Sequence, residues 1–279
     1  MNFRYPLLLS LKNSQSINKL YAVIEMKRLI IIAVVFLVAQ VDAFFLNSRI
    51  INGRPARPGQ FPYIISLRYD NRHVCGGSII SRDYILTAAH CVAHQVDGDS
   101  VEIPPSPFSI RAGSVYLEEG GVVIPVAETI PHQGFNNISF DIALLRLAQP
   151  LNFTEHISSI SLAESDPPMG ANVDVAGWGS LANGQARSEI LQYTTLSSLT
   201  NQECNRLHSH VHESSLCLLP DQHLLNGICQ GDSGGPAVYN DQLVGVASYV
   251  MNGCGTAQPN VFVSVAYTRD WIRENSDLN

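Results

Sequence analysis

The sequence predicts an all-β protein built from short strands, with one α-helix near the C-terminus. Short runs rich in isoleucine, valine and tyrosine recur along the chain, and glycine and proline separate them. This punctuation is typical of a β-barrel. No long linker, repeat or low-complexity segment divides the chain. The 230 residues that follow position 49 are enough for one large all-β domain or two small barrels.

Six runs have the residue types of β-strands. The expected strands cover residues 63–69, 77–80, 84–88, 122–126, 174–176 and 243–248. The first of them, Tyr-Ile-Ile-Ser-Leu-Arg-Tyr, combines β-branched and aromatic side chains, which favour strands. One good helix pattern lies at residues 265–275. Its apolar stripe would consist of Val265, Ala266, Trp271 and Ile272.

The N-terminal region carries the pattern of a secretory signal peptide at residues 26–43. A basic start at 26–28 is followed by an unbroken apolar run at 29–37 and a small-residue cleavage site at 41–43. The apolar run is too short for a membrane anchor, which needs about 20 apolar residues. A polar stretch precedes this pattern, so we expect residues 1–25 to be an upstream extension outside the fold. A long signal region is the alternative interpretation.

The part of the chain from Ile50 onward is strongly acidic. Six of the 17 Lys and Arg residues and two of the 24 Asp and Glu residues precede Ile50, which leaves 11 basic and 22 acidic residues. The net charge of this part is therefore about −11, and it contains no lysine. Such a surface argues against a nucleic acid or an anionic membrane as partner. The scarcity of Lys and Arg is expected of a protein exposed to proteases that cut after basic residues. Simple drift in surface composition is the alternative explanation.

All six cysteines follow the signal pattern. They are Cys75, Cys91, Cys204, Cys217, Cys229 and Cys254. An even number of cysteines behind a signal peptide predicts disulfide bonds, because secreted proteins fold in an oxidising compartment. Spacing alone leaves fifteen pairings open.

Three segments together supply the residue types of a Ser-His-Asp triad. They are Thr-Ala-Ala-His-Cys at 87–91, Asp-Ile-Ala-Leu-Leu at 141–145, and Gly-Asp-Ser-Gly-Gly-Pro at 231–236. Such a triad needs an alcohol aimed at a carbonyl, an imidazole that takes its proton and a carboxylate that holds the imidazole. With these motifs in this order, the sequence from Ile50 to the C-terminus resembles the chymotrypsin-like (trypsin-fold) serine proteases.

The resemblance implies two six-stranded antiparallel β-barrels with the active site between them. His90 and Asp141 would come from the first barrel and Ser233 from the second. It also divides the chain into an activation propeptide at 44–49 and a peptidase domain at 50–279. The implied disulfides are Cys75–Cys91, Cys204–Cys217 and Cys229–Cys254. The propeptide contains no cysteine, so we expect it to leave after cleavage.

The resemblance also assigns the chemistry. Ser233 would be the nucleophile, His90 the general base and then acid, and Asp141 the group that orients and stabilises the imidazolium. The backbone N–H groups of Gly231 and Ser233 would bind the oxyanion, each contributing on the order of 3 kcal/mol in the transition state. Neither a cofactor nor a metal is implied.

Ser-Arg-Ile-Ile-Asn-Gly at 48–53 resembles the activation site of the family. Cleavage after Arg49 would free the amine of Ile50, which would insert and pair with the carboxylate of Asp232. The zymogen should therefore be nearly inactive. Asn52 stands where the family most often has glycine, which is tolerable because Asn also accepts positive φ.

The expected specificity pocket departs from that of trypsin. Its residues would be Gly227, Ile228, Ser248, Tyr249, Val250 and Asn260. Trypsin-like enzymes have an aspartate at the position of Gly227, so no fixed anion would attract a substrate Lys or Arg here. Val250 narrows the slot as in elastases, and Asn260 adds a polar group at its depth. Small to medium apolar P1 residues are expected. Collagenase-like digestive proteases of crustaceans and insects share the glycine, but usually have an acid near Asn260.

Sequons predict possible glycosylation at Asn137 and Asn152. The alternating histidines 208, 210 and 212 could bind a metal, but they lack the closed ligand set of usual zinc sites. A calcium loop at 111–121 is not expected, because Ser114 replaces the acid expected there.

The leading hypothesis is a secreted, monomeric digestive serine endopeptidase of the elastase/collagenase-like arthropod type. Its partners would be protein or peptide substrates, an activating trypsin-like protease and protein protease inhibitors, with neither nucleic acid nor membrane. A salivary, venom or immune role, and a chymotrypsin- or collagenase-like P1 preference, remain alternatives. A non-catalytic binding homologue is the rival from another class, but such homologues commonly lose the serine or histidine, and both are present.

Overall fold

The computed structural model describes residues 24–28, 50–96, 99–136, 138–180, 182–207 and 211–278. The chain divides into two units, Met1–Asn47 and Ser48–Asn279. Of the first unit, residues 24–28 are described, and they form a short helix. No helix within the described ranges is long and apolar enough to cross a membrane. The expected domain boundaries at residues 25, 43 and 49 lie in or beside undescribed segments, so they stay predictions.

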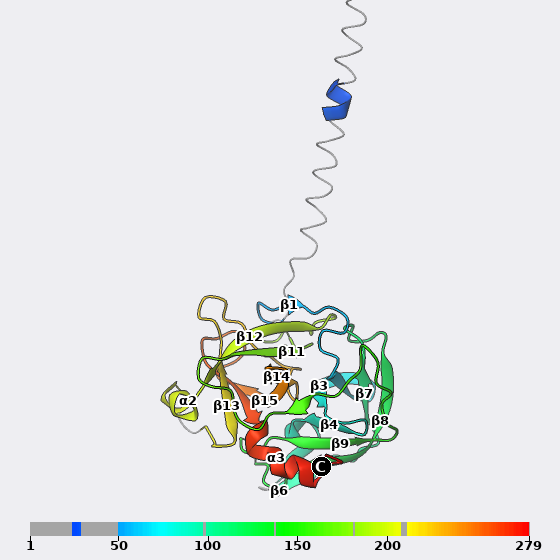
Figure 1. Cartoon of the computed structure of the whole chain (residues 1–279), viewed down its shortest axis with the longest axis vertical. Helices are drawn as coiled ribbons and strands as arrows, with labels where there is room; N and C mark the ends of the chain where they lie inside the picture. Colours follow the sequence, from blue (N-terminus) through cyan, green and yellow to red (C-terminus); the bar gives the residue numbers. More distant parts are fainter. Residues whose placement is uncertain are drawn as a thin grey trace, which may run out of the picture. The chain divides into compact units, whose positions relative to one another are not determined.

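The second unit contains two β-barrels (Figure 1). Six antiparallel strands close the first barrel in the order β2-β3-β4-β9-β8-β7. They are β2 (Ile64–Tyr69), β3 (Arg72–Ile79), β4 (Tyr84–Thr87), β7 (Phe108–Ala112), β8 (Val122–Pro131) and β9 (Ala143–Leu147). Phe108, Ile110 and Leu144 are almost fully buried in its core. The 3₁₀ helix η1 (Ala89–Cys91) follows β4, and β5 (Ala93–Val96) pairs with β6 (Asp99–Glu102) in a small separate sheet.

The second barrel closes in the order β12-β11-β14-β15-β16-β13, with β13 pairing back onto β12. Its strands are β11 (Asn172–Gly177), β12 (Gln192–Leu199), β13 (Ser215–Leu219), β14 (Pro236–Tyr239), β15 (Gln242–Val250) and β16 (Asn260–Ser264). Two short strands extend the sheet, β1 (Arg54–Pro55) on β12 and β10 (Ser161–Leu162) parallel to β15. Leu218 and Phe262 are fully buried in this core. The expected all-β fold with two six-stranded barrels is confirmed.

Two described helices lie in the C-terminal half, α2 (Asn201–Leu207) and α3 (Val265–Glu274). Helix α3 begins at Ser264, whose side-chain oxygen accepts a hydrogen bond from the N–H of Tyr267 at 3.1 Å and so satisfies one free donor of the first turn. The helix ends within one residue of the predicted position. Three of the four predicted stripe residues are buried, and Thr268 takes the place of Ala266 on the buried face.

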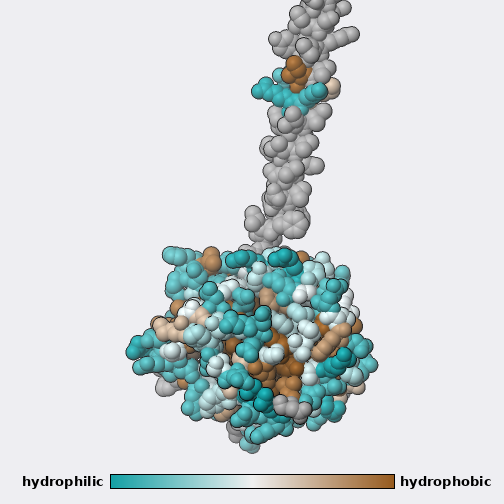
Figure 2. All heavy atoms as spheres, in the orientation of Figure 1, coloured by the Kyte–Doolittle hydropathy of each residue, from teal (hydrophilic) through white to brown (hydrophobic). Residues whose placement is uncertain are grey.

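The face of the molecule in Figure 2 is mostly hydrophilic, with one hydrophobic area near its centre. The large apolar side chains are gathered mainly in the two barrel cores, as burial of apolar surface requires. The barrels therefore form a rigid scaffold, and the loops at the line where they meet are free to carry functional residues.

Candidate active site

His90 and Asp141 meet at the edge of the first barrel. His90 lies in η1, directly after β4, and Asp141 lies just before β9, which pairs with β4. The buried Asp141 carboxylate binds His90 twice: Oδ2 lies 2.7 Å from the ring Nδ1, and Oδ1 accepts the backbone N–H at 2.9 Å. Both bonds fix the orientation of the imidazole and leave Nε2 as its free nitrogen.

The surroundings of His90 favour the protonated ring. Burial opposes a positive charge, but the hydrogen bond and the negative charge of Asp141 outweigh it, so the pKa of His90 is raised above its usual value. A base that gains stability when it is protonated is suited to accept a proton from an alcohol.

Ser248 adds a third bond to this arrangement. Its hydroxyl donates to Oδ2 of Asp141 at 2.5 Å, across 107 residues of sequence. The sequence predicts Ser248 only as part of the pocket wall and gives no sign of this contact. Because the Asp141 carboxylate is buried, a second donor on the same oxygen helps to keep it ionised and in place.

The Ser233 turn packs closely against the first barrel. The backbone carbonyl of Ser233 accepts the N–H of Gly76 at 2.7 Å, and Gly234 donates its N–H to Ala247 in β15 at 2.7 Å. Gly234 has φ of +80°, and a Cβ there would lie 2.2 Å from the hydroxyl of Thr87. Glycine is therefore required at this position, both for its conformation and for the close approach of the two barrels.

The Ser233 and His90 side chains belong to the two sides of this contact. No hydrogen bond between the Ser233 hydroxyl and the His90 ring occurs among those of the described residues. In resting sites of this kind, such bonds are often long and tighten when substrate binds. Ser233 is partly exposed, as a nucleophile that meets a large substrate must be.

Gly231 is held by His73, which is in turn bonded to Ser66, and the sequence gives no sign of either contact. It has φ of +102°, and its carbonyl oxygen lies 3.0 Å from Nε2 of His73. The other ring nitrogen of His73 lies 2.9 Å from the hydroxyl of Ser66. Burial lowers the pKa of His73 to about 4, with the nearby Arg187 guanidinium adding to the effect. The ring is therefore neutral at pH 7, with Nε2–H as donor to Gly231 and Nδ1 as acceptor from Ser66.

The carboxylate of Asp232 is completely buried. It accepts the N–H of Gly179 at 2.7 Å and the N–H of Cys229 at 2.9 Å. Burial raises its pKa to about 6, although these two bonds act in the opposite direction. A Cβ on Gly177 or Gly179 would lie 2.0 or 2.3 Å from a carboxylate oxygen, so both glycines make room for it.

Of the two residues at the expected activation bond, only Ile50 is among the described residues. Ile50 is fully buried, and Arg49 falls outside the described residues. Within the described part of the chain, no ion pair forms with Asp232. Among the described residues, this buried carboxylate therefore has no partner cation.

Asn260 fills the space above Gly227. Its Oδ1 accepts the N–H of Ile228 at 2.8 Å, and a Cβ on Gly227 would lie only 2.4 Å from that oxygen. Val250 pairs with Asn260 in the β15–β16 register and is half-buried, as is its neighbour Tyr249. Four of the residues expected to form the pocket, Gly227, Ile228, Val250 and Asn260, thus lie next to one another.

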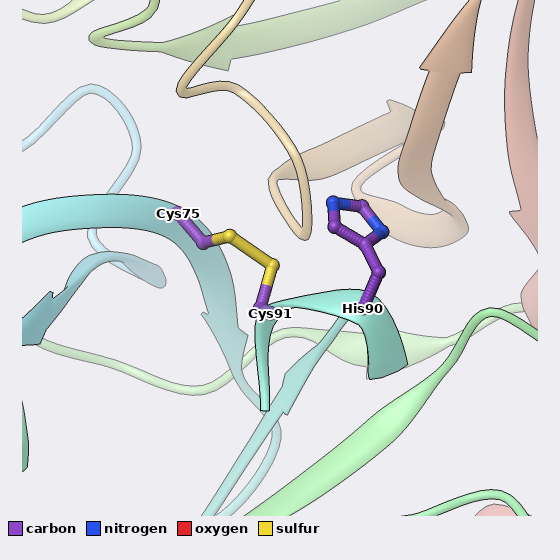
Figure 3. A group of neighbouring side chains, drawn as sticks. All are labelled: Cys75, His90 and Cys91. Atoms are coloured by element: carbon purple, nitrogen blue, oxygen red, sulfur yellow. A yellow bond between two sulfur atoms is a disulfide. The ribbon is translucent and has the colours of Figure 1, made fainter. Parts of the chain in front are cut away.

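Three disulfides join the six cysteines. The pairs are Cys75–Cys91, Cys204–Cys217 and Cys229–Cys254. Figure 3 shows the first of them beside His90. The ligand atoms of Cys75, His90 and Cys91 lie within 4.8 Å of one another. They are unsuited to a metal ion, because the two sulfur atoms are bonded to each other and neither is a thiolate.

Comparison with known proteins shows the family to which the chain belongs. A family model described as trypsin matches residues 50–272. The chain belongs to the trypsin family. It is 38% identical over 230 residues to Serine protease SP24D of Anopheles gambiae, covering 82% of each protein. It is 36% identical over 238 residues to Trypsin delta of Drosophila erecta, covering 83% of this chain and 90% of that protein.

A solved structure gives the same result for the trypsin fold. Neuropsin, a serine protease expressed in the limbic system of mouse brain, superposes with a TM-score of 0.71 at 27% identity. The match covers 80% of this chain and 97% of neuropsin. As a member of the trypsin family, the chain is a serine endopeptidase. Membership of the narrower elastase/collagenase-like group does not follow from these matches.

The remaining predicted sites lie only partly within the described residues. Asn152 is exposed, whereas Asn137 lies outside the described residues, as do the histidines at 208 and 210. The Nδ1 atom of His212 lies 2.8 Å from the hydroxyl of Ser214. In the segment considered for calcium, the buried Arg68 guanidinium forms an ion pair with Glu118 at 2.6 Å.

Proposed function

We propose that this protein is a secreted digestive endopeptidase, made as a zymogen, in which Ser233, His90 and Asp141 act as the catalytic triad. The observation that carries the proposal is the pair of bonds from Asp141 to His90, which leaves Nε2 of the ring free to act as a base. Cleavage profiling with a peptide library, using protein cut after Arg49, tests both the activity and the side-chain preference.

The proposed reaction has two halves. Ser233 Oγ attacks the carbonyl carbon of the substrate while His90 takes the hydroxyl proton, and the carbonyl electron pair moves onto the oxyanion. As the C–N bond breaks, His90 gives that proton to the leaving amine, which leaves an acyl-enzyme. Water then repeats the same steps on the ester and frees Ser233. Asp141 stabilises the imidazolium that exists between the two proton transfers, in keeping with the raised pKa of His90.

The N–H groups of Gly231 and Ser233 are the proposed oxyanion donors. Donors of this kind lower the barrier because they are already oriented before negative charge develops. Ser66 is hydrogen-bonded to His73, and His73 is hydrogen-bonded to the carbonyl of Gly231. These two bonds fix the peptide group between Gly231 and Asp232. We therefore regard His73 as a positioning residue, which acts through Gly231 without touching substrate.

Replacing His73 with alanine should lower kcat by about 10-fold or more with little change in KM. The reason is that a misplaced oxyanion donor weakens transition-state binding alone, and a full loss costs about 10²–10³-fold. The measurement is steady-state kinetics on one apolar-P1 peptide. His73→Gln, whose amide can donate to the Gly231 carbonyl, should recover part of kcat. Equal kcat in wild type and His73→Ala would show that the bond has only a structural role.

The proposed P1 preference is for alanine, valine or leucine. No carboxylate stands at Gly227, and the Asn260 amide fills the space beside it. Burying a Lys or Arg charge there without a partner would be costly. Val250, half-buried on β15, narrows the opening to large rings. Several similar insect proteins are named trypsins, and we propose that this chain differs from a basic-P1 preference through Gly227.

Replacing Val250 with glycine should shift the preference toward phenylalanine and tyrosine. The wild-type enzyme should cut after Ala, Val or Leu faster than after Lys, Arg or Trp. Differences among small apolar residues should be graded, because one methylene is worth about 1–3 kcal/mol. The measurement is kcat/KM on peptides that differ only at P1. Fastest wild-type cleavage after Arg or Lys would contradict the pocket assignment. Fastest cleavage after Phe or Tyr would mean that Val250 leaves the slot open.

The chain organisation follows the same proposal. Residues 26–43 would be the signal peptide, 44–49 the propeptide and 50–279 the peptidase domain, with 1–25 as an upstream extension. The active form would be a monomer that meets protein substrates, an activating protease specific for basic residues and protein inhibitors. Asn152 is exposed, as a glycosylated asparagine must be. The glycine at 227 is also compatible with the collagenase-like group of arthropod digestive proteases.

A further inference from the structure

Arg187 places a positive charge beside the Gly231 turn. It lies in the loop between β11 and β12 of the second barrel. Its backbone forms an isolated antiparallel β-bridge with that of Ser180. Its guanidinium Nη1 donates to the backbone carbonyl of His73. A Cβ placed on Gly231 would lie 3.2 Å from Nε of Arg187. The guanidinium is thus anchored within a few ångströms of Gly231, one of the two proposed oxyanion donors.

Among the described residues, no carboxylate neutralises the charge of Arg187. The residue is exposed, and no ion pair joins it to a carboxylate among the described residues. The positive charge of Arg187 acts on His73: after burial, it is the next largest cause of the lowered pKa of that residue. The chain from Ile50 onward has only 11 basic residues against 22 acidic ones, so the charge beside the Gly231 turn is opposite in sign to the net charge of the domain.

Arg187 lies on the side of Ser233 where the leaving peptide must pass. This step rests on the proposed function, in which His90 protonates the leaving amine. That amine therefore lies toward His90 and its neighbour, the Cys75–Cys91 disulfide (Figure 3). His73, which anchors Arg187, is two residues before Cys75 on the same strand, β3. The proposed P1 pocket, in contrast, uses Gly227, Val250 and Asn260, of which Val250 and Asn260 pair between β15 and β16.

We propose that Arg187 makes the enzyme favour substrates with a carboxylate side chain, Asp or Glu, at the second residue after the scissile bond (P2′). In an extended peptide, alternate side chains point to the same side. P2′ therefore faces the second barrel, as P1 does, whereas P1′ and P3′ face away. Each residue of an extended peptide rises by about 3.3 Å, and P2′ is the second residue after the scissile bond. Its side chain therefore lies within reach of an arginine side chain anchored next to Gly231.

The test uses a matched set of internally quenched peptides with the same apolar P1 and with Glu, Gln or Lys at P2′. The enzymes are wild type, Arg187→Gln, Arg187→Lys and Arg187→Glu, each cut after Arg49. Arg57→Gln is the matched control, because it removes one exposed and unpaired arginine between β1 and β2. Peptides that carry Glu at P1′ or P3′ instead of P2′ test the assigned position.

For wild type we expect kcat/KM to be about 2–5-fold higher with Glu than with Gln at P2′, the range of an exposed ion pair. Lys should be slower than Gln. The Glu preference should shrink at high salt, persist in Arg187→Lys and Arg57→Gln, vanish in Arg187→Gln and reverse in Arg187→Glu. Each ratio is taken within one enzyme, so a general loss of activity in a variant does not affect it.

Equal rates for Glu and Gln at P2′ in the wild type, or a preference that survives in Arg187→Gln, would overturn the proposal. A stronger effect at P1′ or P3′ would overturn the position. These results differ from failure of the proposed function, in which the wild type would cut none of the peptides faster than Ser233→Ala does.

Discussion

Replacing Ser233 with alanine is expected to lower kcat by about 10⁴–10⁶-fold without unfolding the protein. The triad works as a unit, and loss of its nucleophile leaves only the catalysis from the oxyanion donors and from binding, about 10³–10⁴-fold over water. The turn should survive, because its contacts with the first barrel involve the Ser233 carbonyl and Gly234, not the Ser233 hydroxyl. The measurement is kcat on an apolar-P1 peptide, together with the melting temperature.

Ser106→Ala is the matched control, because Ser106 is an exposed serine in a turn before β7. It should retain wild-type kinetics and stability. Near wild-type activity in Ser233→Ala would rule out the assigned nucleophile. A large fall in melting temperature in the same variant would instead mean that the hydroxyl supports the fold.

The candidate triad could be proposed from the sequence because each member lies in a short local motif. Its geometry depends on strand pairing: β4 lies against β9, and this brings the residues after β4 and before β9 together. The sequence shows neither pairing nor register directly. The helix at the C-terminus was also predictable, since its period and its Ser264 cap are local signals.

The residues that sequence reasoning missed act through long-range contacts. His73 reaches Gly231 across 158 residues, and Ser248 reaches Asp141 across 107. A histidine in a strand gives no sign of such a partner, because its surroundings are set by the packing of two barrels. A resemblance to a family gives Ser248 a place in the pocket but says nothing of its hydroxyl.

Several strands were not predicted, for a related reason. In β12, alternate residues face the core, but Thr194 and Ser198 are among the buried ones, so hydrophobicity does not alternate. Strand β13 is the reverse case, with four consecutive buried residues and no period of two. Polar side chains are tolerated inside β12 because they form hydrogen bonds, as the Ser198 hydroxyl does with the N–H of Ala171.

The other large expected effect concerns activation. Protein that is uncut at Arg49 should be at least about 10²–10³-fold less active than protein cut there, because the oxyanion donors depend on the turn around Asp232. Cleavage frees the amine of Ile50, and the buried carboxylate then gains a cation. Sequencing of the active form should read Ile-Ile-Asn-Gly. Arg49→Gln should stay inactive after treatment with a trypsin-like enzyme, and Asp232→Asn should be cut normally but remain poorly active.

Stability against pH tests the same pair without relying on activity. In uncut protein, burial raises the pKa of Asp232 to about 6, above its unfolded value near 4. The folded state therefore holds this proton more tightly than the unfolded state does. The resulting stability is fully present below about pH 4 and is lost as pH rises through about 6. Uncut wild type should lose melting temperature over this range relative to uncut Asp232→Asn.

Cleavage should reverse the dependence. The Ile50 ammonium should lower the pKa of Asp232 and have its own pKa raised above the unfolded value of about 8. The stabilisation by the pair is then present below about pH 8 and lost as pH rises through the folded pKa of the amine. Cut wild type should therefore lose both melting temperature and kcat/KM at alkaline pH, and the loss of melting temperature should be absent in cut Asp232→Asn. Full activity of uncut protein, or identical pH–stability curves before and after the cut, would contradict the Ile50–Asp232 pair.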